Sequence, residues 1–172
     1  MAKPANIYLS HWPFCKLSPR HSVYCQEGGR KIIINTKVHV LKLNQHYNRN
    51  AFNKVLVAEV EKSIEYLNQQ NPRCLIVASA VEGFFSTGAD LKERLELSED
   101  ETGAFVKSLR GIFNKLYYLP YPTISAIDGY ALGGGLEMAL STDLRICTKS
   151  SKLGLPEVKL AIFPAYNALY DC

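Results

Sequence analysis

Three consecutive glycines and a nearby glutamate form the segment of this sequence with the clearest capacity for chemistry. Gly133–Gly135 follow a short apolar run typical of a buried strand, and they precede a stretch typical of a helix. Each glycine costs a helix up to ~1 kcal/mol relative to alanine, so some need for a bare backbone must offset that cost. Either a ligand approaches the N–H groups at the positive helix end, or a neighbouring strand packs too closely for a side chain.

Two glutamates in apolar surroundings are the candidate acid and base. Glu137 lies about one helical turn beyond Gly134, within reach of a ligand held at the glycines. It is either a solvent-facing side chain or a buried acid with a raised pKa. Glu157, in the run LGLPEVKL, is either a second carboxylate of the same cleft or a loop carboxylate paired with Lys152 or Lys159.

The loop Gly88-Ala89-Asp90 is the third candidate element. It comes between a buried strand and a helix, as the glycine run does. In open α/β sheets the carboxyl ends of the strands form the ligand-binding edge. Backbone N–H groups of Ala89 and Gly134 at that edge could together form an oxyanion hole.

The elements that would carry these residues alternate along the chain. Apolar runs and helical periodicity predict a hairpin or bent strand, followed by alternating helices and strands. Ser98 and Glu101 form a predicted capping box at the start of one of these helices. The expected ranges are 31–43, 50–68, 73–79, from about 90, 98–119, 123–128, 133–142 and 143–148. This order predicts an α/β fold with a mostly parallel sheet.

Composition narrows the class of protein. The 172 residues are 47% hydrophobic and 21% charged, as expected for one globular domain. We expect no membrane span, because no stretch approaches the ~18–20 apolar residues that a bilayer requires. Five irregularly spaced cysteines favour free thiols in a reducing compartment.

The basic charge is confined to the beginning of the chain. Residues 1–49 carry a net charge of +7 and residues 50–172 carry −3, so we expect no nucleic-acid partner. Residues 1–30 are predicted to be a basic loop or leader, either a mitochondrial transit peptide or a plain disordered segment. Two His and two Cys in this leader have no apolar core or Cys-x2–4-Cys knuckle around them, so we expect no metal site: His11, Cys15, His21 and Cys25.

Four segments together resemble the crotonase (enoyl-CoA hydratase/isomerase) superfamily. They are Phe85–Arg94, Pro122–Leu140, Asp143–Arg145 and Gly154–Glu157. The sequence ADLKER at residues 89–94 is most similar to the corresponding segment of enoyl-CoA hydratase domain-containing protein 2 and methylglutaconyl-CoA hydratase-like members. The resemblance runs from about residue 37 to 164. It implies a crotonase-like ββα spiral core over residues 31–172.

Family members usually continue past the Pro164 position with a C-terminal helical region that completes the pocket and drives assembly into trimers or hexamers. The amino-acid sequence of this chain after Pro164 departs from the family pattern. The expected core therefore lacks that trimerisation region.

The resemblance also implies a reaction. The N–H groups of Ala89 and Gly134 would hold the thioester oxygen of an acyl-CoA, and Glu137 and Glu157 would add water across a 2-enoyl-CoA. The resemblance further implies that five residues line the CoA site: Ala89, Asp90, Leu91, Lys92 and Gly134. The expected protein is thus a lyase of fatty-acid or branched-chain acyl-CoA breakdown (β-oxidation), in which CoA enters with the substrate and no other cofactor is needed.

The alternative is a catalytically inactive core that binds acyl-CoA or pairs with another subunit. Mitochondrial location is expected, with a cytoplasmic location as the alternative.

Overall fold

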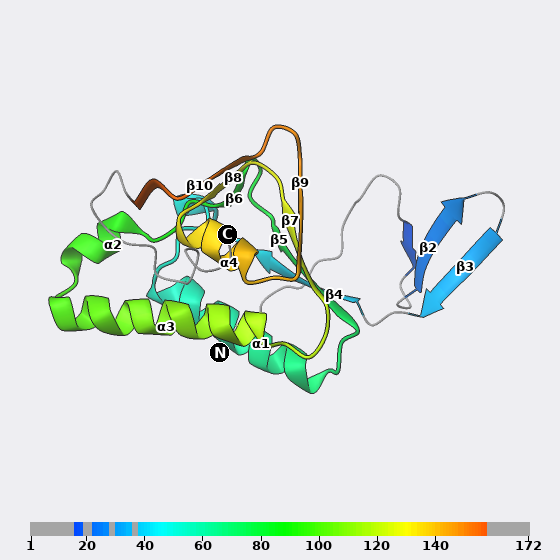
Figure 1. The fold of residues 1–172 in the computed structure, drawn as a ribbon, viewed down its shortest axis with the longest axis horizontal. Coiled ribbons are helices and arrows are strands. Elements are labelled where there is room, and N and C mark those ends of the chain that lie inside the picture. Colours follow the sequence, from blue (N-terminus) through cyan, green and yellow to red (C-terminus); the bar gives the residue numbers. More distant parts are fainter. Residues whose placement is uncertain (1–15, 19–21, 28–29, 36–37, 158–172) are drawn as a thin grey trace.

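A four-stranded parallel sheet forms the centre of the fold (Figure 1). The computed structural model describes residues 16–18, 22–27, 30–35 and 38–157. The strands of this sheet are β4 (Val38–Leu43), β5 (Cys74–Ser79), β7 (Thr123–Ile127) and β9 (Leu144–Cys147), in the order β4-β5-β7-β9. Each neighbouring pair is parallel, which confirms the predicted α/β class.

Two long helices build the main hydrophobic core. α1 (Lys54–Gln69) and α3 (Glu99–Tyr117) run side by side along one side of the fold (Figure 1). Asn53 caps α1, and the predicted capping box of Ser98 and Glu101 opens α3. Their buried faces join strand residues in one cluster, which includes Leu56, Val57, Val60, Ile64, Phe105, Leu109, Phe113, Leu75 and Val77.

Val55 lies outside the buried face of α1. Val55 is 57% exposed, whereas Val57 is buried in the core. Successive helical residues are rotated by about 100°, so a face centred on Leu56 and Val60 turns Val55 towards solvent.

A second, smaller parallel sheet stands beside the first. Its strands are β6 (Phe84–Ser86), β8 (Tyr130–Leu132) and β10 (Lys152–Gly154), in the order β10-β8-β6. The short helix α4 (Gly134–Leu140) follows β8 directly, and α2 (Leu91–Glu96) follows the loop after β6. A one-turn 3-10 helix η1 (His46–Asn48) precedes α1.

The N-terminal strands correct two predictions. β1 (Lys16–Ser18), β2 (Ser22–Glu27) and β3 (Arg30–Asn35) form an antiparallel sheet, although 1–30 was predicted to be loop. Residues 31–43 were predicted to be a hairpin or a bent strand, and the hairpin is wrong, because β3 pairs with β2 and β4 pairs with β5. Two glycines separate the β2 and β3 runs in the sequence, and such a spacer favours pairing of the runs that flank it.

Several sequence predictions fall outside the described residues. They concern the leader before residue 16, the possible ligands His11, Cys15 and His21, and the segment from residue 158, which includes Lys159. Within the ranges that are described, no helix is long and apolar enough to cross a bilayer.

Candidate functional site

The loop after β6 and the beginning of α4 lie in direct contact. A Cβ on Gly88 would be 2.8 Å from the carbonyl oxygen of Leu132 and 3.2 Å from the amide nitrogen of Gly134. Gly88 also has a φ of +86°, a backbone conformation that residues with a side chain rarely adopt. Glycine at this position therefore lets the predicted oxyanion loop approach the helix that carries Gly134.

A bridge to Phe52 fixes the direction of the Ala89 amide. Phe52 N–H donates to the Gly88 carbonyl at 2.7 Å, and Asp90 N–H donates to the Phe52 carbonyl at 2.9 Å. In such a parallel bridge the residue between the two bonded ones directs its own N–H to the opposite side. The N–H of Ala89 consequently points away from Phe52.

The three glycines at 133–135 differ in what a side chain at each position would contact. A Cβ on Gly133 would overlap the carboxylate of Glu157, and the φ of Gly133 is +51°. A Cβ on Gly135 would be 2.7 Å from both Cβ and the carbonyl oxygen of Ser86, so close packing against β6 requires glycine there. A Cβ on Gly134 would meet only ordinary contacts of 3.4 to 3.7 Å.

Gly134 therefore separates the two explanations of the glycine run. Packing within the chain accounts for Gly135 and leaves Gly134 unexplained. As the first residue of α4, Gly134 has an N–H with no acceptor inside its helix. A bare backbone at this position is what a ligand approaching that N–H would need.

Glu137 is buried rather than solvent-facing. Its side chain is only 1% exposed, in the first turn of α4. One of its carboxylate oxygens would be 3.7 Å from a Cβ on Gly134, so the carboxylate lies beside the helix start. The structure thus brings this acid to the position at which a ligand on the Gly134 N–H would meet it.

The second sheet delivers Glu157 to the same place. β10 pairs with β8, and Gly133 N–H donates to the Gly154 carbonyl at 2.9 Å. Glu157 is 8% exposed, and its Oε2 has no hydrogen-bond partner in the described part of the chain. The ion pairs of that part include none between Glu157 and Lys152, so the loop-pairing alternative with Lys152 finds no support.

These groups line one cavity of about 110 Å³. Its walls come from the loop after β6, from α2 and α3, from the start of α4 and from the residues after β10. The lining residues are Thr87, Gly88, Ala89, Leu91, Arg94, Phe105, Val106, Leu109, Gly133, Gly134, Glu137, Pro156 and Glu157. The cavity gathers Ala89, Leu91, Gly134, Glu137 and Glu157 of the predicted site.

Two predicted binding residues do not line this cavity. The Asp90 carboxylate caps α2, because its Oδ1 accepts from the N–H groups of Lys92 and Glu93 at 3.1 and 3.4 Å. Its Oδ2 accepts from the Asn48 side-chain amide at 3.3 Å. The side chain of Lys92 is exposed. Both residues support the loop of Ala89 through the cap instead of facing the cavity.

A buried polar network behind this loop was not predicted. The Asn50 side chain accepts from Gln45 N–H at 2.7 Å, and donates to Ser79 Oγ at 2.8 Å and to the Phe85 carbonyl at 3.0 Å. Ser86 Oγ donates to the Asn50 carbonyl at 2.7 Å and accepts from Gly88 N–H at 3.2 Å. Asn50 thereby ties three chain segments to the oxyanion loop. The sequence signal was Asn50 itself, since Asn adopts the left-handed region (here φ 56°) more readily than most residues.

The motif Asp143–Arg145 has a structural role. Asp143 Oδ2 accepts from the N–H of Thr123 at 2.7 Å and from its hydroxyl at 2.8 Å, which joins α4 to the start of β7. The guanidinium of Arg145 donates to the Thr142 carbonyl at 2.6 Å, near the carboxyl end of α4. These contacts fix the segment that directly follows the helix carrying Glu137.

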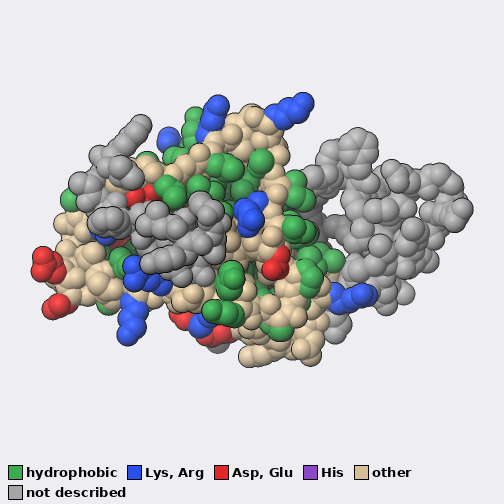
Figure 2. Space-filling model, in the orientation of Figure 1, with side chains coloured by type: hydrophobic (Ala, Val, Ile, Leu, Met, Phe, Trp, Pro, Cys, Tyr) green, Lys and Arg blue, Asp and Glu red, His purple; other side chains and the backbone are tan. Residues whose placement is uncertain are grey.

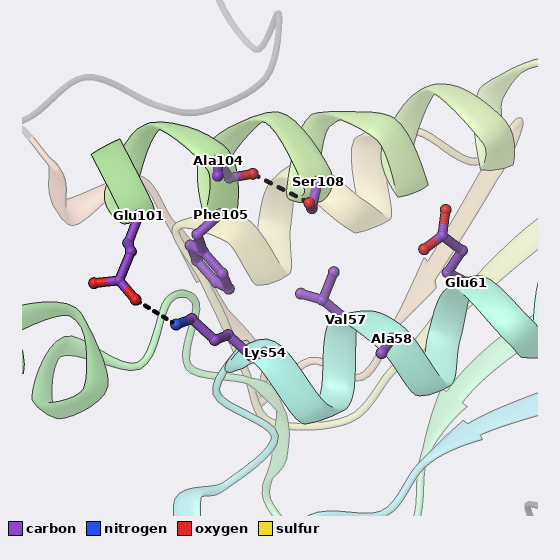
Figure 3. A pocket seen from close by; sticks show the side chains of 8 residues that line it. All are labelled: Lys54, Val57, Ala58, Glu61, Glu101, Ala104, Phe105 and Ser108. Carbon is purple, nitrogen blue, oxygen red and sulfur yellow. Dashed lines mark hydrogen bonds and ion pairs between the residues drawn. The ribbon is translucent and has the colours of Figure 1, made fainter. Parts of the chain in front are cut away.

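A larger cavity of about 260 Å³ lies between α1 and α3 (Figure 3). Lys54 Nζ and Glu101 Oε1 form an ion pair of 3.3 Å across it, and Ser108 Oγ donates to the Ala104 carbonyl at 3.1 Å. The rest of its lining is mainly apolar, from Val57, Ala58 and Phe105. Its polar groups are thus largely satisfied by each other, which gives no indication of catalytic chemistry.

Comparison with known proteins places this chain in a family. The enoyl-CoA hydratase/isomerase family model matches residues 33–170, and the chain belongs to this family. The fold is accordingly the predicted crotonase-like one. It resembles the crystal structure of enoyl-CoA hydratase from Bacillus anthracis, with 37% identity and a TM-score of 0.72 over 76% of this chain and 51% of that one.

Curated relatives give the same family. The chain is 46% identical over 131 residues to methylglutaconyl-CoA hydratase, mitochondrial, from Homo sapiens, covering 76% of this chain and 39% of that protein. It is 44% identical over 131 residues to enoyl-CoA hydratase domain-containing protein 2, mitochondrial, from Mus musculus, covering 76% and 44%. The chain therefore spans about two fifths of the length of these relatives.

Proposed function

We propose that this site adds water across the double bond of a 2-enoyl-CoA thioester. The observation that carries the proposal is the placement of two buried carboxylates, Glu137 and Glu157, in one cavity with Gly134 at the start of α4. The names of the relatives, which include hydratases of acyl-CoA compounds, support the same chemistry.

The thioester oxygen would accept hydrogen bonds from the N–H groups of Ala89 and Gly134. As water attacks C3, negative charge develops on that oxygen, and the two fixed dipoles stabilise the charge. Removal of one such donor typically raises the barrier by ~3–4 kcal/mol. Because Gly134 begins α4, the positive end of a short helix adds to the effect.

The two glutamates would divide the proton transfers. One carboxylate removes a proton from the attacking water, whose oxygen bonds to C3. The enolate then collapses and C2 takes up a proton, so that one water molecule is added in total. Two acid/base groups suit this reaction, because each transfer needs a positioned carboxyl group. CoA enters as part of the substrate, and we propose that no further cofactor or metal takes part.

This chemistry is a lyase reaction suited to fatty-acid or branched-chain acyl-CoA breakdown. We also propose a mitochondrial location, because both curated relatives carry that word in their names.

The test is a hydration assay with the purified 172-residue chain and a short 2-enoyl-CoA. Loss of the enoyl-thioester absorbance reports turnover. Glu137→Gln and Glu157→Gln should each lower kcat by ~10²–10⁴-fold, the usual share of general acid–base catalysis. Glu59→Gln is the matched control, because Glu59 is exposed on α1 away from the cavity. The proposal fails if wild type and both site variants share one background rate.

A second candidate function, a subunit-interaction module without catalysis, is favoured by the surface around β9. All four residues of this edge strand are exposed, and Leu144 and Ile146 are large hydrophobic side chains. Hydrophobic side chains gather around β9 on the face of the molecule shown in Figure 2. An exposed apolar edge strand is a site for pairing with another chain. Sedimentation of the chain, alone and mixed with a full-length relative, tests this candidate. An inactive chain that associates with the relative would favour the interaction module over the enzyme.

A further inference from the structure

Ser86 lies between the two elements that carry the proposed oxyanion donors. It is the last residue of β6, and its side chain is fully buried. A Cβ on Gly135 would be 2.7 Å from the Cβ of Ser86 and 3.0 Å from its Oγ, so Ser86 rests against the first turn of α4. Two residues further along the chain, Gly88 leads into Ala89. One small side chain thus adjoins both the helix of Gly134 and the loop of Ala89.

The hydroxyl of Ser86 both donates and accepts a hydrogen bond. Its Oγ donates to the Asn50 carbonyl at 2.7 Å and accepts from Gly88 N–H at 3.2 Å. Hydrogen bonds in a chain polarise one another, so the bond to Asn50 strengthens the bond from Gly88. The Asn50 side chain in turn donates to the carbonyl of Phe85, the residue before Ser86, at 3.0 Å. The direction of the hydroxyl is therefore fixed from both sides.

Gly88 is the residue that needs such a restraint. Its φ of +86° is accessible because glycine has no side chain, and the same freedom leaves it many other conformations. Rotation of the backbone at Gly88 would turn the peptide unit that contains the Ala89 N–H. In the structure the Gly88 carbonyl accepts from Phe52 N–H at 2.7 Å, while the Gly88 N–H donates to Ser86 Oγ. Without the hydroxyl, only the carbonyl side of Gly88 would be held by these two bonds.

We propose that Ser86 is a positioning residue of the oxyanion hole. Through its hydrogen bond to Gly88 and its contact with Gly135, it directs the N–H groups of Ala89 and Gly134 to one oxygen atom. This inference rests on the proposed function and adds to it a side chain that acts through the backbone. Fixed dipoles stabilise the charge that develops on the thioester oxygen in the transition state. Loss of the hydroxyl should therefore lower kcat more than it changes KM.

The experiment observes the thioester carbonyl directly, so that it does not depend on turnover. Butyryl-CoA isotopically labelled at its carbonyl carbon is saturated and cannot be hydrated. Its carbonyl stretching frequency falls when hydrogen-bond donors polarise the bond, and difference infrared spectroscopy should show this fall on binding to the wild-type chain. Ser86→Ala should return the frequency part of the way to that of free butyryl-CoA. In hydration of 2-butenoyl-CoA the same variant should lose up to ~10²-fold in kcat at a similar KM, as for other misplaced catalytic groups.

Two further variants separate positioning from a general loss of stability. Ser125→Ala removes another buried hydroxyl, which lies on β7 and accepts from Thr142 Oγ1 at 3.0 Å. It should lower the melting temperature, as Ser86→Ala does, because each change leaves a buried hydrogen-bonding group unpaired. The carbonyl frequency and kcat should stay at the wild-type values in Ser125→Ala. Ser86→Cys keeps a weaker donor and acceptor at the position, so its frequency should lie between those of wild type and Ser86→Ala. It also serves as the test if Ser86→Ala does not fold.

Each contrary result has a separate meaning. A wild-type frequency and kcat in Ser86→Ala would overturn the inference and leave the proposed function in place. Equal losses in Ser125→Ala would also overturn it, because general destabilisation would then explain both variants. If wild type binds butyryl-CoA without a change of frequency and does not hydrate 2-butenoyl-CoA, the inference and the proposed function fail together.

Discussion

The two cavities of this protein differ in what their polar groups do. In the cavity between α1 and α3, Lys54 pairs with Glu101, and that carboxylate also accepts from the N–H and hydroxyl of Ser98. In the smaller cavity, Glu157 Oε2 is buried without a partner in the described residues, and Arg94 likewise has none there. The smaller cavity is the stronger candidate, because unmet hydrogen-bonding capacity indicates a ligand better than volume does.

Matched substitutions of one carboxylate from each cavity should give the largest contrast. Glu157→Gln should lower kcat by ~10²–10⁴-fold, while Glu101→Gln leaves kcat unchanged. Only Glu157 lies beside the proposed reacting atoms, whereas Glu101 supports a helix start on the surface. Steady-state assays on both variants check this prediction, and equal losses would remove the distinction between the cavities.

A methyl group at the helix start should separate ligand binding from packing. Gly134→Ala adds a Cβ that meets only ordinary contacts within the protein, so the melting temperature should stay near the wild-type value or rise. The same methyl group would displace a thioester oxygen from the Gly134 N–H, for which we expect a ~10²-fold loss of kcat/KM. Kinetics and thermal unfolding of one preparation measure both effects. Unchanged kinetics would contradict a ligand at Gly134.

The adjacent residue should show the reverse order of effects. Gly135→Ala drives a Cβ to 2.7 Å from the Ser86 carbonyl oxygen, and we expect the free energy of unfolding to fall by ~1–3 kcal/mol, as for other overpacked sites. Chemical denaturation checks the value. A destabilisation no greater than that of Gly134→Ala would show that β6 can yield, and the packing explanation of Gly135 would be wrong.

The smallest effect is expected at the capping box of α3. Ser98→Ala should lower the free energy of unfolding by ~0.5–2 kcal/mol through loss of the cap. Hydrogen bonds from the Ser98 N–H and hydroxyl, and then the Lys54 ammonium, lower the pKa of Glu101. A lowered folded-state pKa stabilises the protein above the unfolded-state value, and that stabilisation is lost as pH falls through the folded-state pKa.

The same linkage gives the pH dependence of this prediction. The stability difference between wild type and Glu101→Gln should therefore be present at neutral pH and disappear in acid. Denaturation curves at pH 7 and at pH values below the ordinary range of a glutamate check the direction. A difference that grows on acidification would contradict it.

Long periodic segments of this fold could be predicted from sequence, and short strands could not. The faces of α1 and α3 follow from apolar residues every three or four positions, and Ser98 and Glu101 mark a helix start. β6, β8 and β10 have three residues each, too few for any period to be visible. The pairing of β3 with β2 instead of β4 depends on contacts between strands, to which a pattern within one strand is insensitive.

The carboxylates of the candidate site could be predicted from the sequence, but the residues that hold its loops in place could not. Glu137 and Glu157 could be singled out because a carboxylate in an apolar run is unusual, yet the run alone left burial of either residue open. The structure decided the burial of both. The cap formed by Asp90 and the network around Asn50 depend on side-chain directions and on partners up to 42 residues away, which spacing in the sequence does not reveal.

The attachment of β10 has a consequence for how activity would be lost. Glu157 reaches the site through a strand that pairs with β8 over only three residues and has no second neighbour among the described strands. Short edge pairings open with a smaller free energy than a core does. Mild heating or denaturant would then withdraw one carboxylate while α1, α3 and the four-stranded sheet persist. Amide hydrogen exchange at Leu153 and Gly154 should accordingly be faster than at the core of β5, and inactivation should precede loss of the far-ultraviolet circular dichroism.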